Sequence, residues 1–133
     1  MLLALAEQQG IRSDVIPRIA TGFCGGISRT GNLCGAVTGG VMGIGLALGR
    51  SSPSESRDQA FAAVQSFLAQ FETRFGSLTC LGLTGCHLGT PEGQEKFRQI
   101  RDRIDCPGFV SEAARIAGEL IQAGSGKDTD ESN

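Results

Sequence analysis

The sequence predicts an all-α protein, a compact bundle of about five to seven helices around a glycine-rich central helix. Apolar residues recur at three- and four-residue spacing over residues 55–75, as in an amphipathic helix. No segment alternates between polar and apolar residues, and no hairpin turn signal separates strand-like segments. A chain of 133 residues has the length of one domain, which we assign to residues 1–123, with residues 124–133 as a disordered tail.

The composition argues against several kinds of partner and location. The net charge is −2, with no basic excess, so nucleic acid is not an expected partner. The uncharged stretch over residues 30–49 is too rich in glycine for a membrane span. Residues 1–10 lack the basic region and cleavage site of a signal peptide and read as a helix already under way. Five cysteines cannot all pair within one chain, so we expect reduced thiols and a cytoplasmic location.

Two short helices are expected first. The first covers about residues 1–9 and ends at Gly10, because glycine commonly follows a helix C-terminus. Ser13 or Asp14 caps the second, which runs to about residue 20 with a proline in its first turn.

The central helix is expected over about residues 33–48, entered through turns over residues 22–32. Each glycine inside a helix costs roughly 0.5–1 kcal/mol relative to alanine, so tertiary contacts must offset that cost. Gly35, Gly39 and Gly43 recur every four residues and therefore share one face. A neighbouring helix, or a second copy of the chain in a homodimer, can approach that face closely.

The longest helix is expected from about residue 55 to residue 75, with Ser54 as its cap and Gly76 as its end. Its apolar stripe reads as core. The stripe consists of Phe61, Val64, Phe67, Leu68, Phe71 and Phe75.

The remaining elements are shorter or more polar. Residues 77–85 form a short segment, and residues 90–104 form a charged helix on the surface. The sequence Cys-Pro-Gly at residues 106–108 is expected to break the chain before a last helix at about residues 109–122.

The cysteines are the main functional signal. None forms a C-x-x-C pair, so zinc ribbons and thioredoxin-like sites find no support. Cys34 and Cys106 stand at helix starts, where the partial positive charge favours a thiolate. Thiolates are the nucleophiles of disulfide exchange and the ligands of soft metals. The candidate redox residues are Cys24, Cys34, Cys80 and Cys106, and the candidate metal ligands are these four and Cys86.

Three other residues adjoin the cysteines. Arg29 is the one charged residue between Cys24 and Cys34. It either lowers the pKa of a thiol or binds an anion, or it is a snorkelling or interface arginine without a functional role. His87 is either a ligand or proton donor or, more commonly for this kind of position, an exposed loop histidine. Asp105 directly precedes the last cysteine and disfavours its thiolate. The candidates for contact with a cofactor are Arg29, Gly35 and Gly39.

A resemblance to a known family follows from two segments and their spacing. Residues 33–39 read Leu-Cys-Gly-Ala-Val-Thr-Gly and carry a C-G-A-x-x-G pattern, and residues 75–80 read Phe-Gly-Ser-Leu-Thr-Cys. Together with Cys106 ahead of a terminal helix, they resemble the redox-active C_GCAxxG_C_C family over nearly the whole chain.

The resemblance implies a small helical protein with redox-active or metal-binding cysteines. It matches Cys34, Cys80 and Cys106 to three of the four cysteines that define the family. The fourth usually lies upstream, in an Asn-Cys-Ala-Gln-like start to the first helix, and the chain begins downstream of that position. Cys24 or Cys86 is the candidate to take its place.

Three functions remain open from the sequence. The first is a redox protein that binds an iron–sulfur cluster, zinc or another soft metal. The second is a metal-free thiol–disulfide protein, with Cys34 as the attacking sulfur and Cys24, Cys80 or Cys106 resolving the bond. The third is a non-catalytic helical module that dimerises. The redox partner is unknown in the first two.

Overall fold

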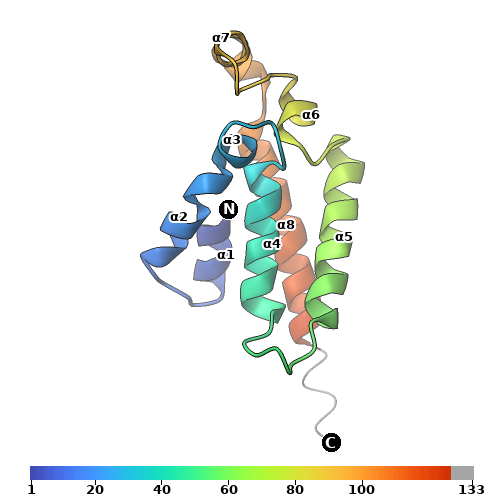
Figure 1. Ribbon diagram of the computed structural model, residues 1–133. Coiled ribbons are helices and arrows are strands. Elements are labelled where there is room, and N and C mark those ends of the chain that lie inside the picture. Colours follow the sequence, from blue (N-terminus) through green and yellow to red (C-terminus); the bar gives the residue numbers. More distant parts are fainter. Residues whose placement is uncertain (127–133) are drawn as a thin grey trace, which may run out of the picture.

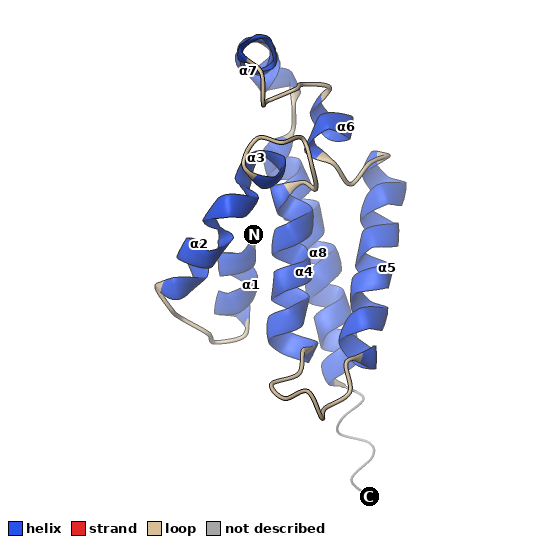
Figure 2. Ribbon diagram, viewed as in Figure 1, coloured by secondary structure: helices blue, strands red, loops and turns tan. Residues whose placement is uncertain are grey.

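The computed structural model describes residues 1–126, and that part of the chain is helical, with no strand (Figure 2). The all-α prediction is confirmed. The longer helices are α4 (Gly35–Leu48), α5 (Asp58–Phe75), α7 (Pro91–Ile100) and α8 (Cys106–Ser125). The shorter elements are α1 (Leu2–Gln8), α2 (Val15–Ala20), η1 (Thr21–Phe23), α3 (Cys24–Ile27), α6 (Cys80–Thr84) and η2 (Arg101–Arg103).

The core lies between α4, α5 and α8, which run side by side along the length of the molecule (Figure 1). Burial of a large apolar side chain stabilises a fold by about 1.5–3 kcal/mol, so this cluster supplies most of the driving force. Its fully buried members include Val37, Ile44, Phe67, Phe71 and Ile116.

Glycines of α4 let its neighbours approach closely, as the four-residue spacing predicts. A Cβ atom at Gly39 would stand 2.6 Å from Met1 Cγ, and one at Gly43 would stand 2.9 Å from Leu5 Cβ of α1. Real Cβ atoms essentially never come within 3.0 Å of such atoms. These glycines therefore serve contacts within the chain, and the homodimer stays a prediction that these contacts do not test.

The phenylalanine stripe of α5 is only partly core. The rings of Phe71 and Phe75 lie 4.8 Å apart between centroids, and Phe75 meets Phe109 of α8 at 4.9 Å. The prediction for Phe61 is wrong, because its side chain is 52% exposed beneath the guanidinium of Arg57 at 5.2 Å.

The start of α5 also differs from prediction, since Arg57 rather than Ser54 is the N-cap. The Ser54 hydroxyl hydrogen-bonds instead to the Ser52 hydroxyl at 2.9 Å, within the loop that precedes the helix. A local serine–serine contact thus replaces the predicted cap.

The Cys-Pro-Gly sequence begins α8 rather than breaking the chain. The Asp105 carboxylate accepts a hydrogen bond from Gly108 N at 2.9 Å and caps the helix. Pro107 falls in the first turn, where proline leaves no hydrogen bond unmade. The last helix is therefore longer than predicted at both ends, and Cys106 belongs to it.

The predicted tail starts inside α8, which runs to Ser125. Its remaining part, residues 127–133, lies outside the described residues. No helix in residues 1–126 combines the length and the apolar character needed to cross a membrane.

Candidate functional site

A left-handed turn fixes the backbone beside the first cysteine. Residues 25–29 all have positive φ, between 54° and 69°, and three of them are not glycine. Left-handed geometry costs roughly 1–2 kcal/mol for each such residue, so the turn is strained. Gly26 is required there, because a Cβ atom would stand 2.8 Å from Asn32 O and closer still to Cys80 Cβ. The turn is thereby packed directly against Cys80.

A short antiparallel contact aligns the next two cysteines. Leu33 and Thr79 form an isolated bridge, and Cys34 N donates a hydrogen bond to Leu78 O at 2.9 Å. Cys34 and Cys80 each follow a bridge residue. Cys80 N in turn donates a hydrogen bond to Asn32 O at 2.8 Å, so the two backbone contacts hold Cys34 and Cys80 near one another.

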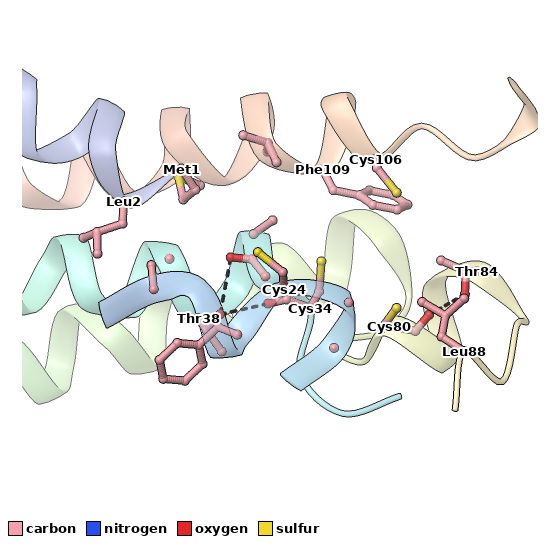
Figure 3. A pocket seen from close by; sticks show the side chains of 18 of the residues that line it. Met1, Leu2, Cys24, Cys34, Thr38, Cys80, Thr84, Leu88, Cys106 and Phe109 are labelled. Carbon is pink, nitrogen blue, oxygen red and sulfur yellow. Dashed lines mark hydrogen bonds between the residues drawn. The ribbon is translucent and has the colours of Figure 1, made fainter. Parts of the chain in front are cut away.

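The other two cysteines approach the same place. Cys106 is the first residue of α8, and Cys24 precedes the left-handed turn. A Cβ atom at Gly35 would lie 4.0 Å from Cys24 Cα, so Cys24 stands beside the start of α4 and next to Cys34. In Figure 3 the sulfur atoms of Cys24 and Cys34 point toward the side from which Cys106 projects.

Cys24, Cys34, Cys80 and Cys106 line one cavity of about 430 Å³ at the end of the bundle (Figure 3). The rest of the wall is mostly apolar, and among the described residues no charged side chain lines it. None of the five cysteines forms a disulfide, and Cys80 is buried while Cys24 and Cys106 are exposed. Four thiols from distant segments therefore share one apolar space with access from solvent.

Two of these thiols are harder to ionise than ordinary cysteines. Burial raises the pKa of the Cys80 thiol, and the nearby charge of Cys34 raises it further. Burial followed by the charge of Cys34 also raises the pKa of Cys106, while Arg101 lowers it and Asp105 raises it. Cys34 is therefore within electrostatic reach of both. The raised pKa of Cys106 runs against the thiolate that its helix start predicts, and Asp105 acts on it in the predicted direction.

The remaining candidates fall into two groups. Gly35 and Gly39 line the cavity, but Arg29 does not. Cys86 is fully buried and is absent from the cavity wall, although it packs in one small cluster with Cys80 and Leu88, and its charge contributes to the raised pKa of Cys80.

The donor set does not suit a single metal ion. Within residues 1–126, no group of three or more histidine, cysteine, aspartate or glutamate side chains could hold one. His87, the histidine considered as a ligand, is exposed, and its carbonyl accepts hydrogen bonds from Thr90.

The sequence did not identify several parts of the wall. Phe109 and Met42 line the cavity from α8 and α4, and the sequence analysis assigned neither of them to the site. The left-handed turn carried one local signal, the Gly25–Gly26 pair, because consecutive glycines often mark positive φ.

Comparison with known proteins gives one match. A protein-family model described as "Putative redox-active protein (C_GCAxxG_C_C)" matches residues 1–120 of the chain. Searches of curated proteins and of solved structures gave no match.

Proposed function

Because the chain belongs to the C_GCAxxG_C_C family, we propose that it is a redox protein that works by thiol–disulfide exchange at Cys34. The observation that carries this proposal is the shared cavity, on whose wall four cysteine thiols lie together. Cys34 lies within electrostatic reach of both Cys80 and Cys106. A reducing compartment such as the cytoplasm would keep these thiols available.

Cys34 is assigned as the attacking sulfur and Cys24 as the resolving one. The thiolate of Cys34 attacks one sulfur of a substrate disulfide, and the first substrate thiol leaves. The thiolate of Cys24 then attacks Cys34 Sγ, which releases the second substrate thiol and leaves a Cys24–Cys34 disulfide. The protein loses two electrons and two protons, and the substrate gains them. The raised pKa values of Cys80 and Cys106 keep these thiols protonated at neutral pH, so they are weaker nucleophiles than ordinary cysteines.

The assignment of Cys24 depends on its place beside Gly35. A disulfide needs Cα atoms no more than about 7 Å apart, and Cys24 and Cys34 are both adjacent to Gly35. Cys86, the other candidate for a fourth cysteine, is absent from the cavity wall that Cys24 and Cys34 share.

An anaerobic redox titration tests the function. The protein is equilibrated with mixtures of reduced and oxidised dithiothreitol, and free thiols are counted after acid quenching. We expect a reversible two-electron transition that Cys34→Ser abolishes and the control Cys86→Ser retains. No reversible loss of thiols in the unaltered protein, or a transition that survives Cys34→Ser, would contradict the proposal.

An iron–sulfur cluster is the second candidate, and the four cysteines around one cavity favour it over a single ion. Cluster irons take cysteine thiolates, and Cys24, Cys34, Cys80 and Cys106 are the donors available in this cavity. Such a cluster would supply one-electron transfer when bound. Iron and acid-labile sulfide analysis of protein prepared without oxygen separates the two candidates. Stoichiometric iron and sulfide, lost in Cys80→Ser, would favour the cluster, and metal-free protein with a reversible disulfide would favour thiol exchange.

A further inference from the structure

The hydroxyl side chains on the cavity wall already donate hydrogen bonds within the protein. Apart from the four thiols, the wall carries two hydroxyl side chains, and both hydroxyls donate to backbone carbonyls. Thr38 Oγ1 donates to Gly35 O at 3.3 Å, and Thr84 Oγ1 donates to Cys80 O at 2.8 Å. A ligand in the cavity therefore meets sulfur and hydrocarbon, with no charged side chain and no uncommitted hydroxyl proton.

Charged side chains lie outside this cavity, in a neighbouring hollow. Arg101, Asp102, Arg103 and Asp105 line that hollow, which shares Cys106 with the cavity. A carboxylate or ammonium group that moved from the hollow into the cavity would lose water and meet no side chain of opposite charge from residues 1–126 there. Desolvation of an unpaired charge is among the largest penalties in binding. The cavity volume of about 430 Å³ lies in the range of small-molecule sites.

We propose that the cavity takes small, uncharged, apolar disulfides as its substrates and excludes charged ones such as glutathione disulfide. This inference rests on the exchange proposed at Cys34. In the reaction the sulfur–sulfur bond of the substrate breaks and that of Cys24–Cys34 forms. The two protons of the protein thiols end on the two leaving thiols, so the substrate is reduced to two molecules of an apolar thiol.

The test compares two aromatic disulfides that differ in charge. Dithiodipyridine is uncharged at neutral pH, and dithiobis(nitrobenzoate) is a dianion. The rate at which Cys34 loses its free thiol is followed for each by acid quenching and peptide mass spectrometry. The ratio of the two rates is then divided by the same ratio for N-acetylcysteine amide, which corrects for the intrinsic reactivity of the probes.

We expect the corrected preference for the uncharged probe to be at least about tenfold, because the dianion must be desolvated where no cationic side chain of the described residues lines the wall. A corrected ratio below that level would overturn the proposal.

A pair of lysine variants locates the selectivity. Val110 lines both the cavity and the neighbouring hollow and is 38% exposed, so Val110→Lys puts a cation where the two adjoin, without burying it deeply. This variant should lower the preference for the uncharged probe at least about threefold, by attraction of the dianion. Leu46→Lys is the matched control, since Leu46 is 41% exposed and lies away from the cavity wall. Equal changes in the two variants would place the selectivity outside the cavity and contradict the proposal.

The same samples separate failure of this inference from failure of the proposed function. A Cys24–Cys34 disulfide that forms without preference between the probes would leave the exchange function intact and remove the substrate class. Mixed disulfides that never convert to a protein disulfide would remove the exchange function itself, and this inference with it.

Discussion

Replacement of Gly40 by alanine tests the close packing of α4 against α5. A Cβ atom at Gly40 would stand 2.8 and 2.9 Å from two ring carbons of Phe67 and closer still to a third. Phe67 is fully buried, so its ring has no free space to move into. Overpacking of this kind costs about 1–3 kcal/mol, and the better helix propensity of alanine offsets about 0.5–1 kcal/mol. The net loss is then about 0–2.5 kcal/mol, which lowers the Tm of a domain of 133 residues by up to roughly 9 °C.

Gly45→Ala in the same helix is the matched control. A Cβ atom at Gly45 would meet nothing within 4 Å, so only the propensity term acts. That variant should gain about 0.5–1 kcal/mol in the free energy of unfolding. Urea unfolding followed by circular dichroism measures both variants. If Gly40→Ala is as stable as Gly45→Ala, α5 does not pack on α4 as described.

Three further predictions concern the cysteines and the strained turn. Cys34→Ser removes a charge that raises the pKa of both Cys80 and Cys106, so the pKa values of these two thiols should fall. Alkylation at a series of pH values, followed by peptide mass spectrometry, measures both. Unchanged pKa values would mean that Cys34 does not lie close enough to act on either thiol. Because the folded pKa of these two thiols exceeds the ordinary value of 9.0, the folded protein holds protons that the unfolded chain releases, and the free energy of unfolding should fall as the pH rises above about 9. Urea unfolding from about pH 8 to about pH 10.5 checks this, and constant stability would refute it. Arg29 has φ of 68° and its side chain is exposed. Arg29→Gly should therefore relieve backbone strain and raise the free energy of unfolding by about 0.5–1 kcal/mol, as measured by urea unfolding. A loss of stability would mean that the arginine side chain supports the turn.

The helices could be predicted well where one local signal dominates. The spacing of Gly35, Gly39 and Gly43 predicted close packing at α4, and Gly76 ends α5 with φ of 81°, as glycine after a helix does. Phe61 was misassigned because a stripe at helical spacing does not reveal where a neighbouring helix stops covering it.

The sequence predicted that the cysteines would lie together, but it did not predict the cavity that they line. The sequence separates Cys34 from Cys80 and Cys106 by long intervals, and only the bridge at Leu33 and the start of α8 bring them together. Cys86 is fully buried and does not reach the cavity wall, and no local pattern encodes that difference from Cys80.

Disulfide mapping after mild oxidation tests the gathering of the four thiols most directly. The protein is oxidised at low concentration, alkylated, digested without reduction, and examined by mass spectrometry. We expect intramolecular bonds that mostly join members of the set Cys24, Cys34, Cys80 and Cys106, with Cys86 recovered mainly as an alkylated thiol, because Cys86 is fully buried and does not line the cavity. Recovery of all four as free thiols, or bonds to Cys86 as frequent as bonds among the four, would contradict a shared site.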